Sequence, residues 1–138
     1  INKLHIRNEY LRPEKAIAGI LDSGGIPVLA HPSYGDGDQL ILGEQMERRI
    51  RRLMDFGLKG LEAYYSGFPD KLREENLAFA ERYALYVTAG SDYHGTNKLV
   101  ELGDTGLDGE RLPDGLLRFL DDVSEVCAKL KTTEKHSR

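Results

Sequence analysis

Asp92 and His94 are residues whose types and spacing are suited to chemistry. They lie two residues apart in the stretch Ala-Gly-Ser-Asp-Tyr-His-Gly at positions 89–95, directly after an apolar run that predicts a buried strand. On extended backbone this spacing allows both side chains to point to one side. A carboxylate beside an imidazole can bind a metal ion or transfer protons. The same residues also fit a strand-to-loop turn in which Asp92 caps main-chain amides and His94 is solvated.

His31 ends a second short apolar strand. It closes the segment Gly-Gly-Ile-Pro-Val-Leu-Ala-His-Pro at positions 24–32, where Pro32 stops the strand. In parallel α/β proteins, sites form at the carboxyl ends of the strands. We therefore expect His31 to share one rim of the sheet with Asp92 and His94.

Helical and strand patterns alternate along the chain. Helices are predicted to begin at Pro13, residue 41, Pro69 and Pro113, and strands cover residues 26–30, 58–64 and 85–88. This order predicts an α/β fold with parallel strands and flanking helices. We expect a single α/β domain over residues 1–131 and a polar tail over 132–138. Three strands are few for such a domain, which favours a missing portion or a partner that completes the sheet.

The middle strand carries a carboxylate where a buried parallel strand should be apolar. Glu62 needs a charged or hydrogen-bonding partner if it is buried, so it lies either near the site or in a structural pair. Tyr64, Tyr65 and Ser66 follow at the carboxyl end of this strand. Their hydroxyl groups could bind an oxyanion of a substrate there.

A cluster of arginines and the single cysteine could also have functions, but the sequence favours structural roles for both. Arg48, Arg49, Arg51 and Arg52 could form a phosphate patch, but their helix position favours a solvated face. Cys127 falls on the apolar stripe of the last helix, which favours a packed core thiol over a nucleophile.

The composition narrows the classes of function. The 138-residue chain has a net charge of −4, which argues against a broad basic face for nucleic acid. No apolar run approaches the roughly 20 residues of a membrane span. One cysteine excludes an intrachain disulfide framework. With no signal peptide visible, we expect a cytoplasmic location and no membrane partner.

Three segments taken together resemble a known family. "GGIPVLAHP", "GLKGLEAYYSG" and "VTAGSDYHG" look like the later part of a PHP (polymerase and histidinol phosphatase) domain, over residues of about 13–106. The most similar subgroup is the stand-alone metal-dependent phosphoesterases that act on nucleotides or oligonucleotides. The resemblance implies part of a distorted seven-stranded β/α barrel with up to three divalent metals at the strand ends.

The resemblance also assigns roles to residues. His31, Asp92 and His94 match metal ligands of the family, and such ligands suit zinc, manganese or iron. Glu62 matches a glutamate common in the strand segment and is assigned no more than a supporting role, together with Tyr64 and Ser66. The implied reaction is hydrolysis of a phosphate ester by water that the metals activate. The implied substrate is a phosphorylated small molecule, a nucleotide or an oligonucleotide.

The chain departs from the family at its amino-terminal end. The first family motif, His-x-His followed by an acid, is absent, and His5 has no histidine at position 3 or 7. We therefore expect the carboxyl-terminal part of a phosphoesterase that binds metal weakly and catalyses little by itself. It would need the missing amino-terminal part or self-association. The alternative is a naturally degenerate module with a binding or structural role.

Overall fold

The structure is a computed structural model that describes residues 10–35, 39–97, 99–107, 109 and 111–135. His5, which does not substitute for the His-x-His motif of the family, and His136 in the polar tail lie outside the described residues. Helices and strands alternate in the order α1 (Pro13–Asp22), β1 (Val28–Leu29), α2 (Gly43–Asp55), β2 (Gly60–Tyr65), α3 (Asp70–Arg82) and β3 (Tyr86–Gly90). A short 3₁₀ helix η1 (Gly95–Asn97) and the long helix α4 (Asp114–Lys135) complete the order.

The three strands form one parallel sheet in the order β1-β2-β3. This confirms the predicted α/β class with parallel strands. Strand β1 is shorter than predicted, with only Val28 and Leu29 in the ladder. Pro27 before it lacks an N–H, and His31 after it turns to a positive φ, so both ends of the strand leave extended pairing.

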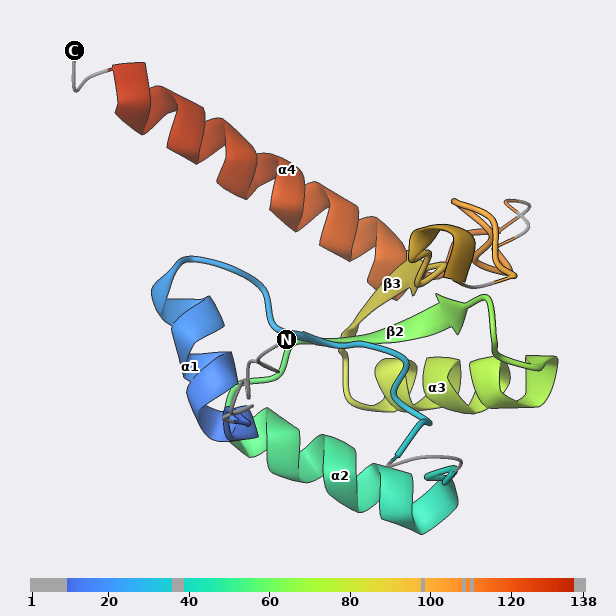
Figure 1. The fold of residues 1–138 in the computed structure, drawn as a ribbon. Helices are drawn as coiled ribbons and strands as arrows, with labels where there is room; N and C mark the ends of the chain where they lie inside the picture. The colour runs from blue at the N-terminus through green and yellow to red at the C-terminus, as the bar shows by residue number, and fades with distance from the viewer. Residues whose placement is uncertain (1–9, 36–38, 98, 108, 110, 136–138) are drawn as a thin grey trace, which may run out of the picture.

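The core lies between the sheet and the helices drawn below it in Figure 1, α2 and α3. Strand β2 contributes Leu61 and Ala63, and both are fully buried. Helix α2 contributes Met46, Ile50 and Leu53, whose spacing of four and three residues places them on one face. The amphipathic pattern predicted for this helix is confirmed.

Helix α4 covers part of the outer edge of β3. The Tyr86 N–H donates to the Lys59 carbonyl, so Leu85 and Val87 direct their main-chain groups away from β2. On that side, the Arg118 guanidinium donates to the Leu85 carbonyl at 3.2 Å and to the Ala84 carbonyl at 3.4 Å. The beginning of this strand edge is thus supplied with hydrogen bonds by a helix.

The part of α4 beyond Leu116 is more exposed than its apolar stripe predicted. Figure 1 shows the helix running out from the sheet. Leu116 is buried, but Leu120 is 49% exposed and Cys127 is exposed. The prediction that Cys127 is a buried core thiol is therefore wrong, because the apolar stripe of α4 extends beyond the sheet on which it could pack. The helix also continues to Lys135, inside the expected tail, since the polar residues Glu134 and Lys135 favour a helix as well as a solvated tail.

In the part of the chain that the structure describes, no helix is both long enough and apolar enough to cross a membrane.

Replacing Leu61 with alanine should lower the free energy of unfolding by about 2–5 kcal/mol, because its side chain is fully buried in the central strand. The matched control is Leu120→Ala, on the exposed part of α4, which should change it by no more than about 0.5 kcal/mol. Urea unfolding followed by circular dichroism measures both. Equal midpoints for the two variants would contradict this core.

Glu47 on α2 joins this helix to the end of α3. It accepts hydrogen bonds from Tyr83 and from Arg82, and these bonds lower the pKa of Glu47 below its ordinary value. A lowered pKa in the folded state gives stability that is present above the unfolded pKa and lost as the pH falls through the folded one. We expect Glu47→Gln to flatten the loss of stability below about pH 4.3, the usual glutamate pKa. Glu44→Gln, four residues from Arg48 on the exposed surface, is the control.

Candidate functional site

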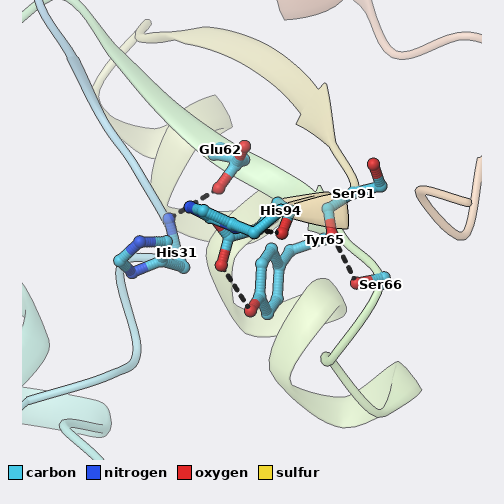
Figure 2. Close-up of polar contacts among 7 residues, drawn as sticks. His31, Glu62, Tyr65, Ser66, Ser91 and His94 are labelled. Atoms are coloured by element: carbon cyan, nitrogen blue, oxygen red, sulfur yellow. Dashed lines mark hydrogen bonds and ion pairs between the residues drawn. The ribbon is translucent and has the colours of Figure 1, made fainter. Parts of the chain in front are cut away.

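The candidate site lies where the three parallel strands end. His31 follows β1, and Asp92 and His94 follow β3, so β2 and its continuation Ser66 stand between them. Figure 2 shows His31, Ser66 and His94 together at this end of the sheet. The sequence predicted this common rim, because the carboxyl ends of parallel strands meet at one edge.

His31 is held in an unusual main-chain conformation. Its φ is +31°, a region that residues with a Cβ seldom occupy. The Glu62 carboxylate accepts a hydrogen bond from the His31 N–H at 2.7 Å. Glu62 therefore lies near the site and has a partner, which answers the question that its place in the strand raised.

The turn after His31 is fixed from two helices. Arg49 of α2 donates to the Pro32 carbonyl at 3.1 Å and to the Tyr34 carbonyl at 3.2 Å. Asn76 of α3 donates to the Ser33 hydroxyl at 3.0 Å, and both side chains are fully buried. Arg49 thus differs from the solvated arginine that its helix position favoured. Its role could not be seen in the sequence, since only the fold brings α2 beside this turn.

The loop after β3 is tied to the end of β2. The Ser66 hydroxyl donates to the Ser91 carbonyl at 3.0 Å, and the Tyr65 hydroxyl donates to an Asp92 carboxylate oxygen at 3.3 Å. Asp92 itself has a φ of +52°. Two side chains of one strand end therefore hold the loop that carries Asp92 and His94.

His94 interacts with its own turn. Its Nδ1 lies 2.6 Å from the Asp92 main-chain oxygen and 3.3 Å from the Asp92 Oδ1. The His94 side chain is 60% exposed, whereas that of Asp92 is 23% exposed. Asp92 and His94 are therefore in contact, but through a turn with Asp92 at positive φ and not through the extended backbone that the sequence predicted.

Aromatic rings pack beside His31. The Tyr65 ring centroid lies 5.6 Å from that of His31, 5.8 Å from that of Tyr34 and 5.1 Å from that of Phe68. Gly67 permits this packing, because a Cβ at that position would lie 2.6 Å from the Tyr65 ring. Tyr65 therefore contacts both flanking loops, through its ring toward His31 and through its hydroxyl toward Asp92.

Tyr64 lies away from this group. Its ring faces the Arg73 guanidinium of α3 at 5.9 Å, and it lines a cavity of about 510 Å³ between α3 and the start of α4. The register between β2 and β3 shifts between Glu62 and Tyr64. Of the two tyrosines predicted at this strand end, Tyr65 contacts Asp92 and Tyr64 contacts Arg73 instead.

The chemical types of His31, Asp92 and His94 fit a divalent metal, but their arrangement does not complete a site. Among the described residues, no group of three or more His, Cys, Asp or Glu side chains is placed to hold a metal ion. The His94 Nδ1 faces the Asp92 main chain instead. The described residues alone therefore do not form a metal site.

Known proteins provide an independent comparison. No family model matches the sequence. The chain is 33% identical over 90 residues to the phosphoribosyl 1,2-cyclic phosphate 1,2-diphosphodiesterase of Eggerthella lenta, covering 63% of this chain and 30% of that protein. It is 27% identical over 90 residues to the 3',5'-nucleoside bisphosphate phosphatase of Chromobacterium violaceum, covering 65% of this chain and 30% of that protein.

Two solved structures have a similar fold. One, from Bifidobacterium adolescentis, is described as a metal-dependent phosphoesterase; its TM-score is 0.61 at 33% identity over 75% of this chain and 35% of the other. The second is an amidohydrolase from Chromobacterium violaceum with bound sulfate and no metal, with a TM-score of 0.65 at 26% identity over 86% of this chain and 39% of the other.

The similarity is therefore to part of larger phosphoesterases. The chain spans 30% of the length of each curated relative it matches. Both of those relatives are named as enzymes that act on phosphate esters. A small parallel sheet with helices fits a portion of a larger α/β barrel.

Replacing Arg49 with methionine should lower the free energy of unfolding by roughly 1–3 kcal/mol, because two carbonyl groups of the turn at residues 32–34 lose a charged donor. The control is Arg52→Met, an exposed arginine of the same helix, with an expected change within about 0.5 kcal/mol. Urea unfolding gives the comparison. If both variants behave alike, the turn does not depend on Arg49.

Proposed function

We propose that this chain is the carboxyl-terminal part of a PHP-type, metal-dependent phosphoesterase. The observation that carries the proposal is the placement of His31 after β1 and of the Asp92/His94 pair after β3, the two parallel strands that flank β2. The similarity to two enzymes named for phosphate-ester hydrolysis supports the same class. The substrate would be a phosphorylated small molecule, of the nucleotide or oligonucleotide class.

In this proposal His31, Asp92 and His94 supply part of a centre for divalent metal, with zinc, manganese or iron as candidates and up to three ions in the complete site. The metal would polarise the phosphate ester and activate water. In this proposal the remaining ligands come from an amino-terminal portion or from a second copy of the chain. The residues of this chain bind and orient: Tyr65 holds Asp92, and Ser66 holds the loop before it.

In this proposal, the protein that supplies the other ligands pairs with an edge of the sheet. Within the described part of the chain, strands β1 and β3 each pair with β2 alone. An amino-terminal portion, or a second copy, could pair there and bring the missing ligands to the same rim. The single domain over residues 1–131 and the cytoplasmic location stay predictions.

A second candidate is a degenerate PHP module with a binding or structural role. The incomplete ligand set among the described residues favours it as much as it favours a divided site. The gene distinguishes the two, because an in-frame His-x-His upstream of Ile1 belongs only to the phosphoesterase.

We would measure metal content by elemental analysis, together with hydrolysis of a generic phosphodiester and a nucleotide monoester under added manganese. The isolated chain should bind little metal and show little turnover. The protein with its upstream portion should bind metal and hydrolyse the substrates. In that longer protein, Asp92→Ala should lower turnover and metal content, with turnover falling by at least about 100-fold, more than the loss of a supporting residue produces.

The matched control is Asp55→Ala, an exposed aspartate at the end of α2, which should leave both readouts unchanged. Full activity of the isolated 138 residues would contradict a divided site. Unchanged activity of Asp92→Ala in the longer protein would contradict its role as a ligand.

A further inference from the structure

The Glu62 side chain reaches both neighbouring strands. Its Oε2 accepts the hydrogen bond from the His31 N–H at 2.7 Å, just beyond β1. Its Oε1 lies over Gly90, the last residue of β3, where a Cβ would be only 2.2 Å from that oxygen. One carboxylate thus spans the ends of all three strands.

Gly90 is needed for space and not for its backbone conformation. Gly90 is not among the glycines with positive φ, so an alanine could adopt its main-chain angles. A side chain at position 90 would collide with the Glu62 carboxylate. A contact of 2.2 Å is impossible between unbonded carbon and oxygen, so a side chain at position 90 must displace the carboxylate.

His31 needs such a restraint. Its φ of +31° is disfavoured for a residue with a Cβ, and such conformations persist only where surrounding contacts enforce them. In Figure 2 the hydrogen bond joins Glu62 to the main chain of His31, and the imidazole projects away from the carboxylate. Through this bond Glu62 therefore fixes the main chain that carries the imidazole, and the bond does not involve the ring.

We infer that Glu62 and Gly90 form a latch: Glu62 is a positioning residue that fixes the main chain of His31, and residue 90 must be glycine because the carboxylate occupies its side-chain space. What the latch is for rests on the proposed function, in which His31 is a ligand. The latch itself is a property of this chain and is tested without metal.

The first measurement is hydrogen exchange of the His31 amide by NMR in the 138-residue protein. Glu62→Ala should speed exchange about tenfold or more, as expected for loss of a hydrogen bond to a charged acceptor. Glu62→Gln keeps an acceptor oxygen and should restore most of the protection. Glu75→Ala is the control, because Glu75 also accepts a main-chain hydrogen bond, from the Gly43 N–H at 2.9 Å and not from His31.

The second measurement tests whether Gly90 acts through Glu62. Gly90→Ala should release the His31 amide as Glu62→Ala does, and the double variant should be no worse than Glu62→Ala alone, since the collision has then been removed. Circular dichroism confirms that each variant is folded, and Glu62→Gln keeps the test valid if the alanine variant unfolds.

Unchanged His31 exchange in Glu62→Ala would overturn the latch, as would additive effects of the two substitutions. In the longer protein, Glu62→Ala should weaken manganese binding about 10-fold and Glu62→Gln much less. Equal losses for both would make Glu62 a ligand and not a positioning residue. If the longer protein neither binds manganese nor hydrolyses phosphate esters, the proposed function fails, while the exchange result still decides the latch.

Discussion

The hydrogen bond from the His31 N–H to the Glu62 carboxylate is the contact on which the rim of this sheet depends. It joins the end of the two-residue strand β1 to the central strand, where few ladder bonds are present to hold it. The turn that follows is then fixed by Arg49 and by Asn76. A short strand with a strained end therefore keeps one conformation because three separate elements restrain it.

Side chains at the end of the central strand β2 form hydrogen bonds with the segments that follow both neighbouring strands. Glu62 reaches toward β1, whereas Tyr65 and Ser66 hold the loop beyond β3. Tyr65 contacts Asp92 at the rim, whereas Tyr64 lies against Arg73 of α3. Polar side chains of β2 thus position the candidate ligands without being ligands in the proposal.

Among the described residues, strands β1 and β3 each pair with β2 alone, and no group of three side chains is placed to hold a metal ion. Helix α4 supplies hydrogen bonds to the beginning of β3 through Arg118, but its later residues run away from the sheet. Both features agree with a chain that spans 30% of the length of its curated relatives.

The sequence by itself determined the alternation of helices and parallel strands, the buried face of α2 and the position of His31 and Asp92 after strand ends, because periodicity and strand direction are local properties. It placed Glu62 near the site or in a pair, and the structure shows that it is both. Only the tertiary structure decided that Tyr65, and not Tyr64, contacts Asp92, that Arg49 holds the turn after His31 and that Gly90 makes room for Glu62. Each of these depends on residues far apart in the chain, whose contact no local pattern records.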